Sequence, residues 1–95
     1  MSGGHVLVDE VQESCVLVGV ASSGVSDELL DEYLDELEFL AETAGAITKF
    51  KFKQNLQFPN PKTYVGTGKL DEIRDYVRAN DIEIVIFEYI FSVIR

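Results

Sequence analysis

The stretch Cys15-Val-Leu-Val-Gly-Val20 decides the fold of this 95-residue chain. It is a continuous apolar run rich in valine, and such runs are typical of strands that are buried on both faces of a sheet. A strand of this kind needs helices above and below it, so the run predicts an α/β domain. Cys15 is the only cysteine. Its apolar neighbours indicate a buried thiol without a disulfide or zinc role, which fits a reducing cytoplasm.

A helix is expected directly after this strand. Ser26 is a suitable N-cap, and Val25 and Leu30 occupy the two positions of a hydrophobic staple. Gly45 is placed to end the helix in the left-handed conformation. The acids between Asp31 and Glu38 lie mostly off the apolar stripe and predict a solvated outer face. The stripe expected to face the sheet consists of Leu30, Tyr33, Leu34, Leu37, Leu40, Ala41 and Ala44.

The rest of the chain continues to alternate between strands and helices. Residues 46–54 predict a strand with Phe50 and Phe52 on its buried face and lysines on the other, where they also protect a sheet edge. A Pro-containing loop, a short strand at 63–66, a helix at 69–79 ended by Asn80 and a strand at 82–87 follow. The order β-α-β-β-α-β predicts one small domain with a mostly parallel sheet of about four strands and two helices. Residues 1–14 are interpreted as a flexible or edge segment, and residues 15–95 as the domain.

The charge of the chain is distributed unevenly. A formal net charge of −9 argues against nucleic-acid binding by the chain as a whole. Acids without any Lys or Arg fill the stretch from Asp27 to Glu42, whereas five lysines and no acid occur from Lys49 to Lys69. Two interpretations stay open: solvated faces that keep the domain soluble, or a basic surface for phosphates that distance screens from the acidic helix. The candidate RNA- or phosphate-binding residues are Lys49, Lys51, Lys53, Lys62, Gly66, Gly68 and Lys69, which Arg74 and Arg78 would extend.

The segment Gly66-Thr-Gly-Lys69 invites comparison with a P-loop, and it departs from that motif at two positions. Thr63 stands where the first glycine belongs, and Leu70 replaces the magnesium-binding hydroxyl. A plain strand-to-helix turn and a weak single-anion site both remain open. The single histidine, His5, lies in the expected flexible start, so no Ser/His/Asp or Cys/His set is available. We therefore assign no catalytic residue and no metal ligand.

The segments at 37–45 and 59–69 are longer motifs, and together they resemble the N-terminal domains of HflX-type GTPases. Leu37-Glu-Phe-Leu-Ala-Glu-Thr-Ala-Gly45 resembles their ELxxLAxTAGA helix end. Pro59-Asn-Pro-Lys-Thr-Tyr-Val-Gly-Thr-Gly-Lys69 resembles their PxPxTYxGxGK segment, and strands at 16–20 and 84–87 match in order. The ending Glu88-Tyr-Ile-Phe-Ser-Val-Ile-Arg95 departs from the family's acidic pair and ELSPxQ segment.

The resemblance implies a domain that is cut off before the GTPase domain of a cytoplasmic parent protein. GTP and magnesium would then belong to the parent, with no cofactor for this chain. The implied partner is the large ribosomal subunit and its rRNA, in a family linked to ribosome splitting and rescue; ATP binding is a weaker implication. We expect no membrane and no DNA partner. The alternatives are a small-molecule site at the carboxyl ends of the strands and a self-association module, a homodimer formed through the apolar tail at 87–94.

Overall fold

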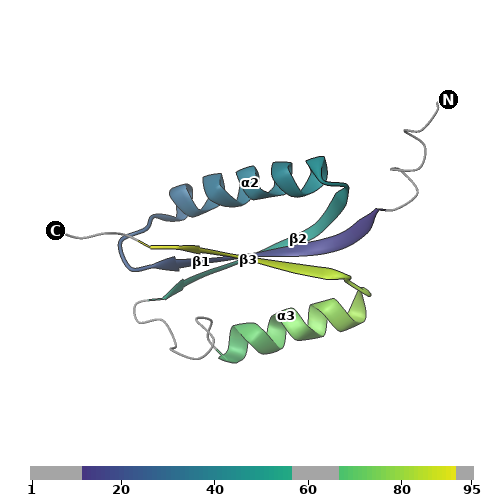
Figure 1. Cartoon of the computed structure of the whole chain (residues 1–95). Helices are drawn as coiled ribbons and strands as arrows, with labels where there is room; N and C mark the ends of the chain where they lie inside the picture. Colours follow the sequence, from purple (N-terminus) through teal and green to yellow (C-terminus); the bar gives the residue numbers. More distant parts are fainter. Residues whose placement is uncertain (1–11, 57–66, 92–95) are drawn as a thin grey trace.

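A computed structural model describes residues 12–56 and 67–91 of the chain. All strand pairs of the sheet are parallel, with β1 in the centre and the order β2-β1-β3. One helix covers each face of this sheet, so the domain has three layers (Figure 1). The predicted α/β class and parallel sheet are therefore confirmed. The elements in chain order are β1 (Glu13–Ser22), α2 (Asp27–Thr43), β2 (Ala46–Leu56), α3 (Thr67–Ala79) and β3 (Ile84–Ile90).

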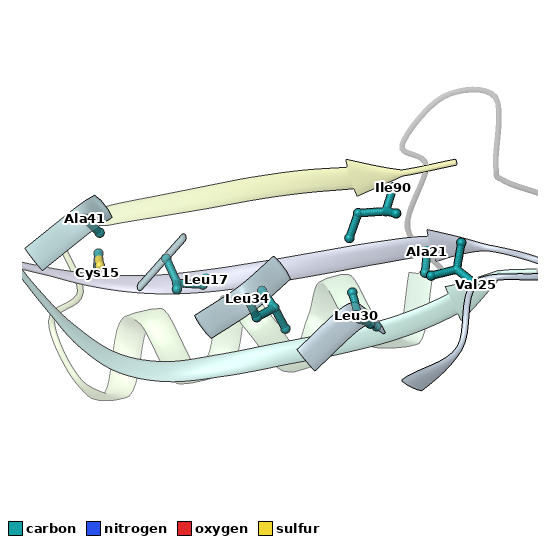
Figure 2. Close-up of a cluster of buried hydrophobic side chains, with 8 residues drawn as sticks. All are labelled: Cys15, Leu17, Ala21, Val25, Leu30, Leu34, Ala41 and Ile90. Atoms are coloured by element: carbon teal, nitrogen blue, oxygen red, sulfur yellow. The ribbon is translucent and has the colours of Figure 1, made fainter. Parts of the chain in front are cut away.

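The central strand β1 is buried on both faces, as its apolar run predicts. Cys15, Val16, Leu17 and Val18 have no exposed surface. The odd-numbered residues of this run face α2, and the even-numbered residues face α3. Figure 2 shows the α2-side cluster, in which Leu30 and Leu34 pack with Leu17 and with Ile90 of β3. Cys15 is a buried free thiol, as expected.

The ends of α2 follow the local signals in the sequence. The Ser26 hydroxyl accepts a hydrogen bond from the Leu29 amide at 3.1 Å, and Gly45 has a φ of +98°. The expected stripe is only partly correct. Leu30 and Leu34 are at most 1% exposed, but Leu40 is 57% exposed. Tyr33 is also exposed, because the stripe spans a wider arc than the sheet covers.

The α3 layer is built around aromatic side chains. Phe52 and Ile73 pack against Val16, Val18 and Val20 of β1. The rings of Phe50 and Phe52 lie 4.8 Å apart edge to face, and both contact the ring of Tyr76. This cluster attaches α3 to β2, and it confirms that the two phenylalanines share one face of β2.

The number of strands and several element boundaries and caps differ from the sequence-based prediction. The described sheet has three strands rather than about four, and the strand predicted at 63–66 lies outside the described residues. The left-handed residue after α3 is Asp81, with a φ of 51°, and not Asn80. β3 begins at Ile84 rather than at 82, because residue 83 is held by Ser14 before the ladder starts. β1 begins at Glu13, two residues before the predicted domain boundary.

β2 contains an irregularity that alternation alone does not predict. Cys15 pairs with Thr48 and Val16 pairs with Phe50, so Lys49 is an extra residue on β2. A bulge of this kind leaves one residue without a partner on the neighbouring strand and bends the strand locally. Lys49 therefore does not share the register of Lys51 and Lys53, and the predicted row of three equivalent lysines is wrong at this position.

Candidate functional site

The acidic helix α2 lies directly over the lysines of β2. The Lys51 ammonium is 2.8 Å from the Glu38 carboxylate and 3.0 Å from that of Asp35. The Lys53 ammonium is 2.9 Å from the Asp31 carboxylate. Asn55 continues this row, since its amide donates to the Asp27 carboxylate at 3.1 Å.

These contacts overturn two expectations about the charges. The acidic helix is not separated from the basic strand by distance, and Asp31, Asp35 and Glu38 are not simply a solvated outer face. The physical reason is the crossover connection between the parallel strands β1 and β2, which returns α2 across the strand that it leads into. The outer positions Glu32 and Glu36 remain exposed.

The ion pairs favour the charged form of both lysines. Hydrogen bonds to Glu38 and then to Asp35 raise the pKa of Lys51 above its ordinary value. A hydrogen bond to Asp31 raises the pKa of Lys53 in the same way. Each of these two ammonium groups already has an anionic partner within the domain. A phosphate would therefore have to compete with a carboxylate to bind either of them.

The remaining candidate residues do not join Lys51 and Lys53 on one surface. Lys69 lies on α3, across the sheet, with its ammonium 3.0 Å from the Glu72 carboxylate and 6.0 Å from the centre of the Phe52 ring. Gly68 lies in the first turn of α3. Lys62 and Gly66 fall outside the described residues. The candidate set that the sequence predicts is thus divided between the two faces of the sheet.

Two cations differ from the others in having no ion-pair partner within residues 12–56 and 67–91, namely Lys49 and Arg78. Both are exposed. The Tyr76 hydroxyl donates to the Lys49 carbonyl at 3.4 Å, which places the end of α3 that carries Arg78 beside the bulge of β2. Lys49 is in the predicted set and Arg78 in its extension, but the sequence does not distinguish them from the paired lysines.

Glu88 is a residue that the sequence-based reasoning missed. It pairs with Gly19 in the register of β3 and β1, and a Cβ on Gly19 would point at Leu30 and Leu34, so this position faces α2. The Oε1 atom of Glu88 is buried, and none of the residues in 12–56 and 67–91 offers it a hydrogen bond. Burial, and then the charge of Glu36, raises the pKa of the Glu88 carboxyl. A single acid within an otherwise apolar strand is the signal that would have identified it.

Glu88→Gln is expected to raise the free energy of unfolding near pH 7, by on the order of 1 kcal/mol. The folded-state pKa lies above the unfolded value, so the ionised carboxylate costs stability above the folded pKa. This cost begins to fall as the pH drops through the folded pKa and is gone below the unfolded pKa, where the advantage of glutamine should vanish. Urea denaturation of both proteins at neutral and acidic pH measures the difference. Glu32→Gln, at an exposed position on α2, is the control; an equal gain there would contradict the account.

No metal centre and no membrane span is found among the described residues. Their His, Cys, Asp and Glu side chains form no group of three or more that is arranged to hold a metal ion. None of the helices in the described part of the chain is long and apolar enough to cross a membrane.

The fold and surface define a small three-layer α/β domain, and comparison with known proteins gives its family. The family described as "GTP-binding GTPase N-terminal" matches residues 31–94, more than half of the chain. The chain therefore belongs to this family, as an N-terminal domain of the HflX type.

Curated relatives support the same assignment, and each of them has the name "GTPase HflX". The chain is 47% identical over 76 residues to the protein of Flavobacterium psychrophilum, a match that covers 80% of this chain and 18% of the relative. It is 41% identical over 68 residues to that of Lacrimispora saccharolytica, which covers 72% and 16% respectively. The protein of Caldanaerobacter subterraneus subsp. tengcongensis is 35% identical over 75 residues, covering 79% and 17%. The chain thus spans less than a fifth of the length of these relatives.

Proposed function

We propose that this domain is a binding module that helps an HflX-type GTP-binding protein engage the large ribosomal subunit in the cytoplasm. The family match over residues 31–94 is the observation that carries the proposal. The curated relatives are GTPases, and this chain corresponds to less than a fifth of each. We assign GTP binding and hydrolysis, with magnesium, to the remainder of such a parent protein, and we assign no cofactor to this chain.

The ion pairs of the domain narrow the choice of lysines and arginines that could contact the phosphates of rRNA. RNA binding draws much of its free energy from counterions that are released when lysines and arginines neutralise phosphates. Lys51 and Lys53 are already neutralised by the carboxylates of α2. Lys49 and Arg78 have no such partner in the described part of the chain, so they form the stronger candidates for phosphate contact. Lys62 also remains a candidate for phosphate contact, on the basis of the sequence alone, because it lies outside the described residues.

The double variant Lys49→Gln, Arg78→Gln is expected to weaken co-sedimentation of the chain with purified large ribosomal subunits. The slope of log affinity against log salt concentration should fall in magnitude by about two units, roughly one for each lost phosphate contact. The slope counts released ions, so it separates a lost phosphate contact from a general change in shape.

Lys51→Gln is the matched control for this experiment. It also removes one positive charge from β2, but that charge is paired with Glu38 and Asp35. The salt dependence should therefore change little. If Lys51→Gln reduces the slope as much as loss of Lys49 or Arg78 does, then the internal ion pairs open on binding and the proposed choice of cations is wrong.

A second candidate function is self-association through β3, which pairs only with β1 among the described strands. On its α3 side, the rings of Phe87, Tyr89 and Phe91 are stacked along the strand at centroid distances of 6.2 and 6.5 Å. They are 38%, 40% and 55% exposed. An apolar edge strand favours pairing with another strand. Mass that depends on concentration in the absence of ribosomes would favour this function over the first. The part of the predicted tail at 92–94 lies outside the described residues.

A further inference from the structure

A second apolar stripe runs along α2, beside the stripe that packs on the sheet. It consists of Leu29, Tyr33 and Leu40, which are 39%, 37% and 57% exposed. Leu29 and Tyr33 line an open hollow together with Glu32 and Glu36. Residues four and seven apart lie on one side of a helix, so the three apolar residues and Glu36 share this side.

The position of the stripe relative to the strands follows from contacts already described. Asp31, Asp35 and Glu38 reach the lysines of β2, which fixes that flank of α2. Helical spacing places Glu36 on the opposite flank, and its negative charge raises the pKa of Glu88 on β3. The stripe therefore borders the α2-facing side of β3. α2 packs mainly over β1 and β2, so this side of β3 is only partly covered.

The charges that the described residues place along this border are all negative. Glu32 and Glu36 stand on α2, and Glu88 lies on the α2-facing side of β3 with a buried Oε1 that has no hydrogen-bond partner among the described residues. The described lysines that approach α2 lie on its other flank. A buried carboxylate oxygen without a partner is costly, and a guanidinium or ammonium group supplies the donors that it lacks. The surface is thus complementary to a cation flanked by apolar side chains.

We propose that the border between α2 and β3 is a docking surface for a basic amphipathic helix of a partner protein. Apolar side chains of the partner pack on Leu29, Tyr33 and Leu40, and an arginine or lysine inserts between Glu36 and Glu88. Helix-in-groove recognition of this kind uses anchors spaced by one and two helical turns, which is the spacing of the stripe itself. The inference uses a different surface from the RNA contact proposed above and does not rest on it.

The probe for this surface is a fluorescein-labelled helical peptide made of leucine, alanine and arginine, with its leucines on one face. Its affinity for the 95-residue chain is measured by fluorescence anisotropy at about physiological salt. The double variant Glu36→Gln, Glu88→Gln should weaken binding by about tenfold or more, because the arginine loses both carboxylates. Loss of folding does not confuse this result, since Glu88→Gln is expected to stabilise the domain.

The matched control is the double variant Glu28→Gln, Glu42→Gln, which removes the same charge from exposed positions on the other flank of α2. Its affinity should stay within about twofold of the original. An equal loss in both double variants would show that the peptide responds only to net charge and would overturn the proposal. Two further results would overturn the proposal. One is equal binding of a peptide in which every arginine is replaced by glutamine. The other is displacement of the basic peptide by a single-stranded RNA oligonucleotide, which would show that the surface binds RNA rather than a helix.

Discussion

Leu34→Ala is expected to lower the free energy of unfolding by about 2–5 kcal/mol. The Leu34 side chain is 1% exposed and lies in the cluster that joins α2 to β1 and β3 (Figure 2). Removing it leaves a cavity between α2 and the sheet. A domain of this size has a total stability of only several kcal/mol, so the variant should be close to unfolded. Urea denaturation with an unchanged slope against denaturant measures the loss.

Leu40→Ala is the matched control, since it makes the same substitution on the same helix at a side chain that is 57% exposed. Its effect should stay within about 0.5 kcal/mol. Equal losses for Leu34 and Leu40 would mean that α2 presents a different side to the sheet. That result would also remove the exposed stripe on which the docking proposal depends.

Gly19→Val is expected to cost about 1–3 kcal/mol, the second largest effect. A Cβ on Gly19 would lie 2.9 Å from a terminal methyl of Leu30 and 3.0 Å from one of Leu34. Both leucines are fully buried, so their methyls have little space to move into. The added side chain must therefore push α2 away from β1. Thermal or urea denaturation measures the loss, which should be smaller when Leu34 is simultaneously replaced by alanine.

Gly68→Ala is expected to have the opposite effect to Gly19→Val and to stabilise the domain. Nothing lies within 4 Å of a Cβ added there, and the residue is in the first turns of α3. Alanine should stabilise the helix by about 0.5–1 kcal/mol. A loss of stability at Gly68, or no loss at Gly19, would contradict the packing described for these two positions.

The local features of the fold could be predicted because each depends on a few neighbouring residues. The apolar run at 15–20 predicts a buried central strand whatever lies beside it. Ser26 and Gly45 mark the two ends of α2 through their own side chain and backbone. The three-residue extension of β3 beyond 87 could not be predicted in this way, since its pairing with Val20 and Ala21 depends on a strand that lies more than sixty residues earlier in the chain.

The side of α2 that faces the sheet could not be predicted with the same certainty. Its apolar residues form two stripes, Leu30–Leu34–Leu37–Ala41 and Leu29–Tyr33–Leu40, and both have helical spacing. Only the position of the helix over β1 and β2 decides between them. The bulge at Lys49 could not be predicted from local sequence either, because it is defined by the pairing of β2 with β1.

The sequence names candidate residues for the site, but it does not give their arrangement. The sequence contains the acids at 31, 35 and 38 and the lysines at 51 and 53, whose spacings suit a helix and a strand that lie side by side. Recognising their pairing requires the crossover geometry that places α2 over β2. Lys49 and Arg78 are set apart from the other cations only by this arrangement. Glu88 stands out in the sequence as a single acid in an apolar strand, but its unpartnered oxygen is visible only in the structure.

The account is tested most directly by co-sedimentation of the 95-residue chain with purified large and small ribosomal subunits over a series of salt concentrations. We expect weak binding to the large subunit that falls steeply as salt rises, and little binding to the small subunit. Binding at low salt should be detectable despite the net charge of −9. Equal binding to both subunits, or no binding to the large subunit at low salt, would contradict the proposal that this domain contributes to ribosome recognition.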